Sequence, residues 1–113
     1  MTVRVTSDLW VSAHVRRCFS AGAMAVVARR GAFDAGAIFL KVNRLDRSFD
    51  LYGPAPQTLF EDDHPRDRLF EKLLDGVPEM DVDERLAREA RFDPDFWLIE
   101  IEDREGRSFL DGV

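Results

Sequence analysis

The residues with the clearest potential for chemistry lie near the N-terminus, where Trp10, His14 and Arg17 are spaced i, i+4 and i+7. On a helix this spacing places the three side chains on one flank. An indole, an imidazole and a guanidinium side by side can bind a ligand or a protein partner through stacking, hydrogen bonds and charge. The alternative is that Trp10 packs on the edge of a sheet while His14 and Arg17 are only solvated beside it.

Charge is unevenly distributed along the chain. Residues 1–58 carry 8 basic and 4 acidic side chains, whereas residues 59–113 carry 8 basic and 18 acidic ones. Within the basic half, Arg29 and Arg30 end an apolar run, a place where binding loops often lie. Converging arginines bind phosphates, nucleic-acid backbones or acidic proteins. The alternative is that they form ion pairs with the protein's own acidic half.

A second group of candidates is an acidic cluster near the C-terminus, which comprises Asp93, Asp95, Glu100, Glu102 and Asp103. Carboxylates at i and i+2 on a strand share a face, so they can bind a divalent ion or act as acid and base. The spacing matches no calcium loop, and Glu100 and Glu102 could equally keep an edge strand from associating. No further pattern of catalytic, metal-binding or cofactor-binding residues is present, so we predict no catalytic residue, no metal and no cofactor.

The remaining composition limits the class of protein. The net charge of −6 argues against a nucleic-acid coat protein. A single cysteine, Cys18, excludes an internal disulfide and is predicted to be a buried structural thiol. The longest apolar or small run, 21–28, is too short to span a membrane, and residues 1–4 show no secretion signal. These features predict a cytoplasmic protein. Separately, His64 is expected to lie in a polar loop.

Hydrophobic periodicity predicts the elements that position these residues. Helices are expected over 7–21 and 79–91, the first with a core stripe of Val11, Val15, Cys18, Phe19 and Gly22. Four strands are expected over 24–28, 37–44, 48–52 and 96–102. Residues 68–74 fit either a helix or a strand, and we favour the strand. Gly53 and Pro54 are expected to break the sheet, and 108–110 are candidates for a last short strand.

The element order is therefore α-β-β-β-(β)-α-β, which indicates an α+β fold in a single domain over 1–113. We expect a mixed, mostly antiparallel sheet of about five strands. The short connections between the first three strands favour an antiparallel meander. Because several strands carry apolar residues on both sides, the two helices are expected on opposite faces, in α/β/α layers.

Several stretches resemble an uncharacterised alphaproteobacterial family of short proteins, a domain of unknown function. The residues that carry the resemblance are 10–13, 16–18, 29–31, 34–37, 41–45, 53–57, 91–97 and 100–107. The likeness extends over nearly the whole chain and implies a complete small bacterial protein. It implies no activity, cofactor or catalytic residue.

The first functional hypothesis is a non-enzymatic binding domain that uses Trp10, His14, Arg17, Arg29 and Arg30. Its partner would be an acidic protein or a second copy of itself. The alternative is a small enzyme acting on an anionic substrate, positioned by Arg29 and Arg30 with Glu100 or Glu102 as base. A weaker alternative is RNA binding.

Overall fold

The computed structural model describes residues 5–56 and 68–113. The N-terminal residues 1–4 and the polar loop with His64, both interpreted above, lie outside the described residues. The elements are α1 (Ser7–Ser20), β1 (Met24–Arg29), β2 (Ile38–Asn43), β3 (Phe49–Pro54), β4 (Phe70–Val77), α2 (Glu79–Phe92) and β5 (Trp97–Glu102). The predicted α-β-β-β-β-α-β order is confirmed, and residues around 68–74 do form a strand.

Helix α1 has chemical signals at both ends. The Thr6 hydroxyl accepts a hydrogen bond from the Leu9 amide and so satisfies one amide of the first turn. At the other end, Gly22 adopts φ +90° and the Ala23 amide donates to the Cys18 carbonyl. This is the arrangement in which a glycine with positive φ ends a helix. These local interactions explain why the sequence predicted the ends of α1 to within one residue.

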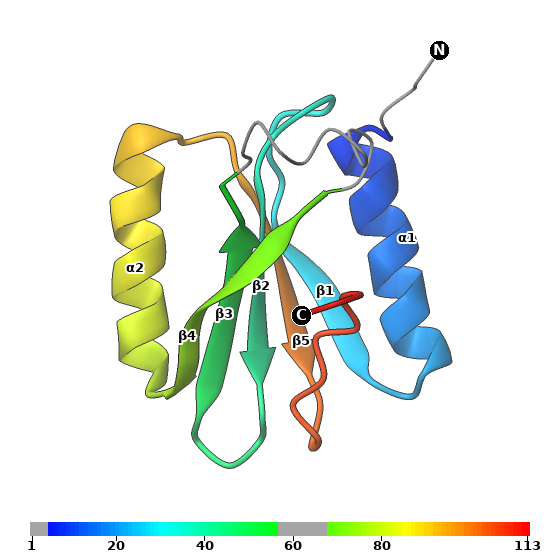
Figure 1. Ribbon diagram of the computed structural model, residues 1–113, viewed down its shortest axis with the longest axis vertical. Coiled ribbons are helices and arrows are strands. Elements are labelled where there is room, and N and C mark those ends of the chain that lie inside the picture. The colour runs from blue at the N-terminus through cyan, green and yellow to red at the C-terminus, as the bar shows by residue number, and fades with distance from the viewer. Residues whose placement is uncertain (1–4, 57–67) are drawn as a thin grey trace.

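The sheet has the strand order β1-β5-β2-β3-β4, so β1 and β4 form its edges (Figure 1). Strand β5 is antiparallel to β1 and parallel to β2, whereas the pairs β2–β3 and β3–β4 are antiparallel. The predicted meander of the first three strands is therefore wrong for β1. The loop between β1 and β2 passes over the start of β5, so that β5 lies between the two strands. The Ala32 amide in this loop donates a hydrogen bond to the Asp95 carbonyl, just before β5, at 2.8 Å. Gly31 allows this approach, since a Cβ there would lie 2.3 Å from the Asp95 carbonyl oxygen.

Two further predictions about strands are also wrong. Strand β3 continues through Gly53 to Pro54, which pairs with Phe70. The proline is tolerated because it is the last residue of the strand, where a missing donor removes little of the ladder. Residues 108–110 form no strand, since Phe109 has φ +64°, a left-handed conformation that an extended strand does not contain.

The two helices lie on opposite sides of the sheet (Figure 1). Two clusters of buried apolar side chains follow the alternation of the strands. One contains Val11 and Cys18 of α1 and the other contains Val82 and Leu86 of α2. Phe19, predicted in the core stripe of α1, is half exposed, and the buried positions of the helix are Ser7, Val11, His14 and Cys18. Neither helix of the described chain has the length and apolar character needed to cross a membrane.

Candidate functional site

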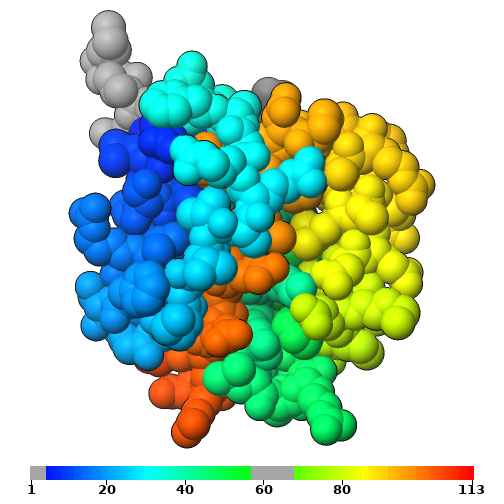
Figure 2. All heavy atoms as spheres, turned by 180° about the vertical axis from the view of Figure 1, so that it is seen from behind, coloured from blue at the N-terminus to red at the C-terminus, as the bar shows by residue number. Residues whose placement is uncertain are grey.

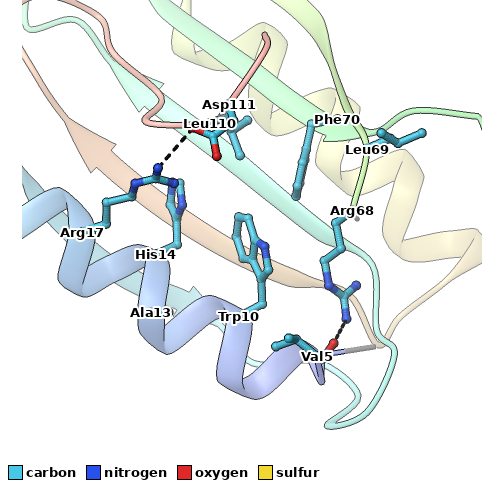
Figure 3. A pocket seen from close by; sticks show the side chains of 10 residues that line it. All are labelled: Val5, Trp10, Ala13, His14, Arg17, Arg68, Leu69, Phe70, Leu110 and Asp111. Atoms are coloured by element: carbon cyan, nitrogen blue, oxygen red, sulfur yellow. Dashed lines mark hydrogen bonds and ion pairs between the residues drawn. The ribbon is translucent and has the colours of Figure 1, made fainter. Parts of the chain in front are cut away.

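A cleft of about 610 Å³ opens between α1, the start of β4 and the C-terminal segment (Figure 3). We call it the Trp10 cleft. It contains Trp10, His14 and Arg17, so the structure brings together all three candidates predicted on α1. The residues that line it are Val5, Trp10, Ala13, His14, Arg17, Arg68, Leu69, Phe70, Leu110 and Asp111. Its volume lies within the range typical of ligand-binding pockets.

Helix α1 supplies one wall of the cleft. Trp10 and His14, one turn apart, stack with ring centroids 4.7 Å apart and planes at 8°. The other face of the cleft contributes Phe70 from β4, whose ring centroid lies 5.2 Å from that of Trp10. The stack holds the indole in place at little further cost in side-chain entropy, which suits an aromatic that contacts a ligand.

His14 is buried, which differs from its expected place on an exposed flank. Its Nε2 lies 2.8 Å from the Ser108 carbonyl oxygen, which can only accept, so Nε2 carries the hydrogen. Burial lowers the pKa of His14 below its ordinary value of 6.5, more than the Ser108 carbonyl raises it. The neutral imidazole therefore links α1 to the C-terminal segment through this hydrogen bond, and its ring stacks against the indole of Trp10.

Arg17 and Arg68 lie on either side of Trp10 (Figure 3). The Arg17 guanidinium is 3.1 Å from the Asp111 carboxylate, and the two side chains are 53% and 88% exposed. Arg68 donates to the Val5 carbonyl oxygen at 2.9 Å. The sequence did not point to Arg68, Phe70 or Asp111, because nothing local marks residues that reach a site from distant parts of the chain.

Arg29 and Arg30, the other binding candidates, lie away from the Trp10 cleft. The Arg29 guanidinium lies 4.3 Å from the centroid of Phe96 and donates to the Pro94 carbonyl. The Arg30 guanidinium lies 5.2 Å from the centroid of Trp97 and 3.3 Å from the Asp8 carboxylate. Phe96 and Trp97 belong to the two opposite hydrophobic clusters. The two arginines therefore do not converge on one substrate.

The predicted acidic cluster separates into two places. Asp93 accepts a hydrogen bond from the Asp95 amide in the turn before β5. Glu100 lies on the α2 side of the sheet, 3.9 Å from the Lys41 ammonium, while Glu102 is exposed at the end of the same strand. Asp103, directly after the strand, is buried and forms an ion pair with Arg107 at 2.7 Å. Within residues 5–56 and 68–113, no group of three or more His, Cys, Asp or Glu is arranged to hold a metal ion.

Lys41 is the buried cation of the α2 side. Its ammonium donates to Glu79 at 2.7 Å and to Asp83 at 3.0 Å, both on α2. Burial alone lowers the pKa of Lys41, but the hydrogen bonds to Glu79 and Asp83 raise it above its ordinary value. Lys41 thus holds α2 against the sheet as a charged group.

A further cluster of charged side chains, which the sequence did not reveal, surrounds Asp50. The Asp50 side chain is fully buried. Its carboxylate accepts from the Arg44 guanidinium, with Nε to Oδ2 at 2.9 Å, and from the Gly76 amide at 2.7 Å. The Lys72 ammonium lies 3.7 Å away, and Asp75 binds both cations from the outside. We call these residues the Asp50 cluster. Every charge in it has a partner, so it connects β2, β3 and β4 and is a structural feature.

Cys18 is buried within the cluster of the α1 side, as predicted. Burial raises the pKa of its thiol to about 11. A thiol in this state is neither a nucleophile nor a metal ligand at neutral pH.

Three solved structures resemble this fold closely. A protein from Agrobacterium tumefaciens, known from its solution structure, is 44% identical over 88% of this chain and 86% of its own, with a TM-score of 0.78. A DUF1491 family protein from Caulobacter crescentus, known from its crystal structure, is 37% identical over 96% of this chain and 95% of its own, with a TM-score of 0.78. An NMR structure of a DUF1491 family protein from Caulobacter crescentus is 38% identical over 97% of this chain and 96% of its own, with a TM-score of 0.79.

Among curated proteins, none matches this chain significantly. A family model described as protein of unknown function (DUF1491) matches residues 5–111. The match covers nearly all of the chain, and the alphaproteobacterial relatives share its fold, which confirms the resemblance drawn from the sequence. The chain therefore belongs to the DUF1491 family of proteins of unknown function.

Proposed function

We propose that this protein is a non-enzymatic binding domain that holds an acidic segment of a protein partner in the Trp10 cleft. The observation that carries the proposal is the arrangement of Arg17 and Arg68 on either side of the Trp10 and Phe70 rings. Self-association, the other partner class expected from the sequence, fits a different surface, the edge of β1.

The aromatic part of the cleft supports binding of an apolar side chain. Trp10 and Phe70 are only partly buried, so a face of the pair is open to a partner. Aromatic rings that are already held in one rotamer contribute most of the affinity at many protein interfaces. A phenylalanine or leucine of the partner would contact these rings.

The cationic part supports binding of a carboxylate beside that side chain. The Arg17–Asp111 pair is exposed, and an exposed ion pair contributes only about 0–1 kcal/mol. Arg17 can therefore exchange Asp111 for a carboxylate of the partner at little cost. A guanidinium binds carboxylates through two parallel hydrogen bonds, which gives the cleft a preference for acidic over neutral segments.

The proposed enzyme activity on an anionic substrate has less support. It requires Arg29 and Arg30 to face one carboxylate base, but their guanidinium groups lie against rings of opposite clusters. Glu100 in turn lies beside Lys41 on the α2 side. For the same reason Arg29 and Arg30 do not form one basic patch for RNA.

A random peptide library selected on the intact protein tests the proposal. We expect enriched peptides to combine Asp or Glu with an aromatic or leucine residue. In an NMR titration an enriched synthetic peptide should shift the indole N–H signal of Trp10. The indole of Trp97 is an internal control, because it is buried and donates to the Ala32 carbonyl at 2.7 Å.

The matched variants are Arg17→Glu and Arg16→Glu, which reverse charge at neighbouring exposed positions of α1, only the first of which lines the cleft. Arg17→Glu should weaken peptide binding at least about tenfold, and Arg16→Glu should weaken it less. No enrichment, enrichment of basic peptides, or equal binding by the two variants would each overturn the proposal. A single-stranded RNA that shifts Trp10 in place of acidic peptides would favour the nucleic-acid alternative.

A further inference from the structure

We infer that two copies of this protein pair through strand β1, so that their sheets join across a two-fold axis. Strand β1 has a partner, β5, along one edge only, and in the described residues no strand covers its other edge. An uncovered edge presents N–H and C=O groups that can pair with a further strand. This surface is separate from the Trp10 cleft, so the inference goes beyond the proposed function.

The opposite edge of the same sheet, formed by β4, is protected against pairing with a further strand. Strand β4 contains Glu71, Lys72 and Asp75, and its pairing with β3 is interrupted by two register shifts. Charges and irregularities of this kind keep edge strands from associating. Strand β1 carries no charge from Met24 to Ala28, and its single register shift lies at its end, between Val27 and Arg29.

The side chains of β1 are apolar and exposed. Met24, Val26 and Val27 are 55%, 52% and 38% exposed, and Phe19 at the end of α1 is 50% exposed. Strand β1 lies at the surface between α1 and β5 on the side of the molecule seen in Figure 2. Four of the eleven large apolar side chains exposed in the described residues therefore lie within residues 19–27. Such a concentration indicates a surface that is covered in the functional protein.

Charge at the two ends of β1 favours a second copy over an unrelated strand. Glu102 and Glu100 are the β5 residues paired with Met24 and Val26, so their side chains share the α2 side of the sheet. Arg29, at the other end of β1, lies on the same side against Phe96. In an antiparallel pair centred on Val26, Ala28 of each copy lies opposite Met24 of the other. The register shift between Val27 and Arg29 then brings Arg29 beside that Met24, within reach of its Glu102.

Two-fold symmetry gives this contact twice, because a closed dimer uses the same surface on both copies and pairs identical strands antiparallel. A hollow of about 220 Å³, whose lining includes Met24, Val26, Lys41, Glu100 and Glu102, lies beside the strand. Because the Lys41 ammonium is hydrogen-bonded to Glu79 and Asp83, the exposed Glu102 is the carboxylate that faces the incoming arginine. A pair of six-residue strands buries less than a standard interface, so we expect a dissociation constant on the order of 10–100 μM.

Sedimentation equilibrium of the full chain between about 10 μM and 1 mM tests the inference. The wild type should shift from monomer to dimer over this range. Val26→Lys places a charge at the centre of the edge and should raise the dissociation constant at least about tenfold. The matched control is Met80→Lys on α2, which changes another exposed apolar residue and should dimerise as the wild type does.

A charge exchange tests the pairing itself. Glu102→Arg alone should weaken the dimer, and Glu102→Arg combined with Arg29→Glu should restore it. Circular dichroism spectra will show that each variant keeps its fold. Arg17→Glu should dimerise normally, which separates this inference from the Trp10 cleft. A wild type that stays monomeric at 1 mM, equal behaviour of the two lysine variants, or failure of the double exchange to restore the dimer would each overturn it.

Discussion

The Asp50 cluster and the Trp10 cleft contain the same chemical groups and use them differently. In the Asp50 cluster a buried carboxylate accepts hydrogen bonds from Arg44 and the Gly76 amide, and the Lys72 ammonium lies beside it. In the Trp10 cleft, Arg17 and Asp111 form a pair that is open to water. A charged group that is buried and fully paired cannot be exchanged without a large cost, whereas an exposed pair can. The same residue types therefore support stability in one place and recognition in the other.

The largest effect is expected in the Asp50 cluster. Asp50→Ala leaves the Gly76 amide and one side of the Arg44 guanidinium without an acceptor, so we expect a loss of about 3 kcal/mol in the free energy of unfolding. Urea denaturation followed by circular dichroism measures it. The control is Asp75→Ala, which removes an exposed carboxylate from the same two cations and should cost far less. Equal losses in the two variants would contradict the distinction between buried and exposed charge.

An intermediate effect is expected from His14, the buried group of the Trp10 cleft. Because its pKa is lowered in the folded state, the unfolded chain binds a proton more readily. Stability from neutral His14 is therefore complete above about pH 6.5 and is lost as the pH falls below that value. We expect the wild type to lose more stability than His14→Gln between about pH 7 and pH 5. The pH dependence of the urea midpoint measures this difference, and parallel curves would show that His14 is not responsible.

The smallest effect on stability is expected at the rim of the cleft. Arg17→Ala removes an exposed ion pair and should change the free energy of unfolding by about 0.5 kcal/mol or less. The same substitution should weaken the binding of acidic peptides, since Arg17 provides the guanidinium. Thermal unfolding measures the change in stability, and peptide titration of the same preparation measures the change in affinity. A large destabilisation would mean that Arg17 belongs with the structural arginines such as Arg44.

Much of the fold was predictable because its signals are local. The ends of α1 follow from Thr6 and Gly22, and its Trp10, His14 and Arg17 flank follows from spacing along a helix. The separation of Arg29 from Arg30 could also have been expected, because consecutive residues of an extended segment point to opposite sides.

The sheet order could not be read in the same way. The short loop between β1 and β2 favoured direct pairing, yet β5, which begins almost 70 residues after β1 ends, lies between them. The decisive contacts are two hydrogen bonds at the start of β5: the Ala32 amide donates to the Asp95 carbonyl, and the Trp97 amide donates to the Ala37 carbonyl. Pairing over such a distance in sequence depends on which apolar faces can be buried together, and no local pattern records that.

Local sequence accounts for the kinds of element, the ends of α1 and the three candidate residues of that helix, because hydrogen bonds and periodicity within a few residues control them. The folded chain brings together residues that are far apart in the sequence. It brings Arg68, Phe70 and Asp111 to Trp10, buries His14 and leaves Arg17 exposed. It also pairs Asp50 with Arg44 and Lys72 and places β1 at an edge. Whether a charge is structural or available for binding depends on burial, and burial exists only after packing.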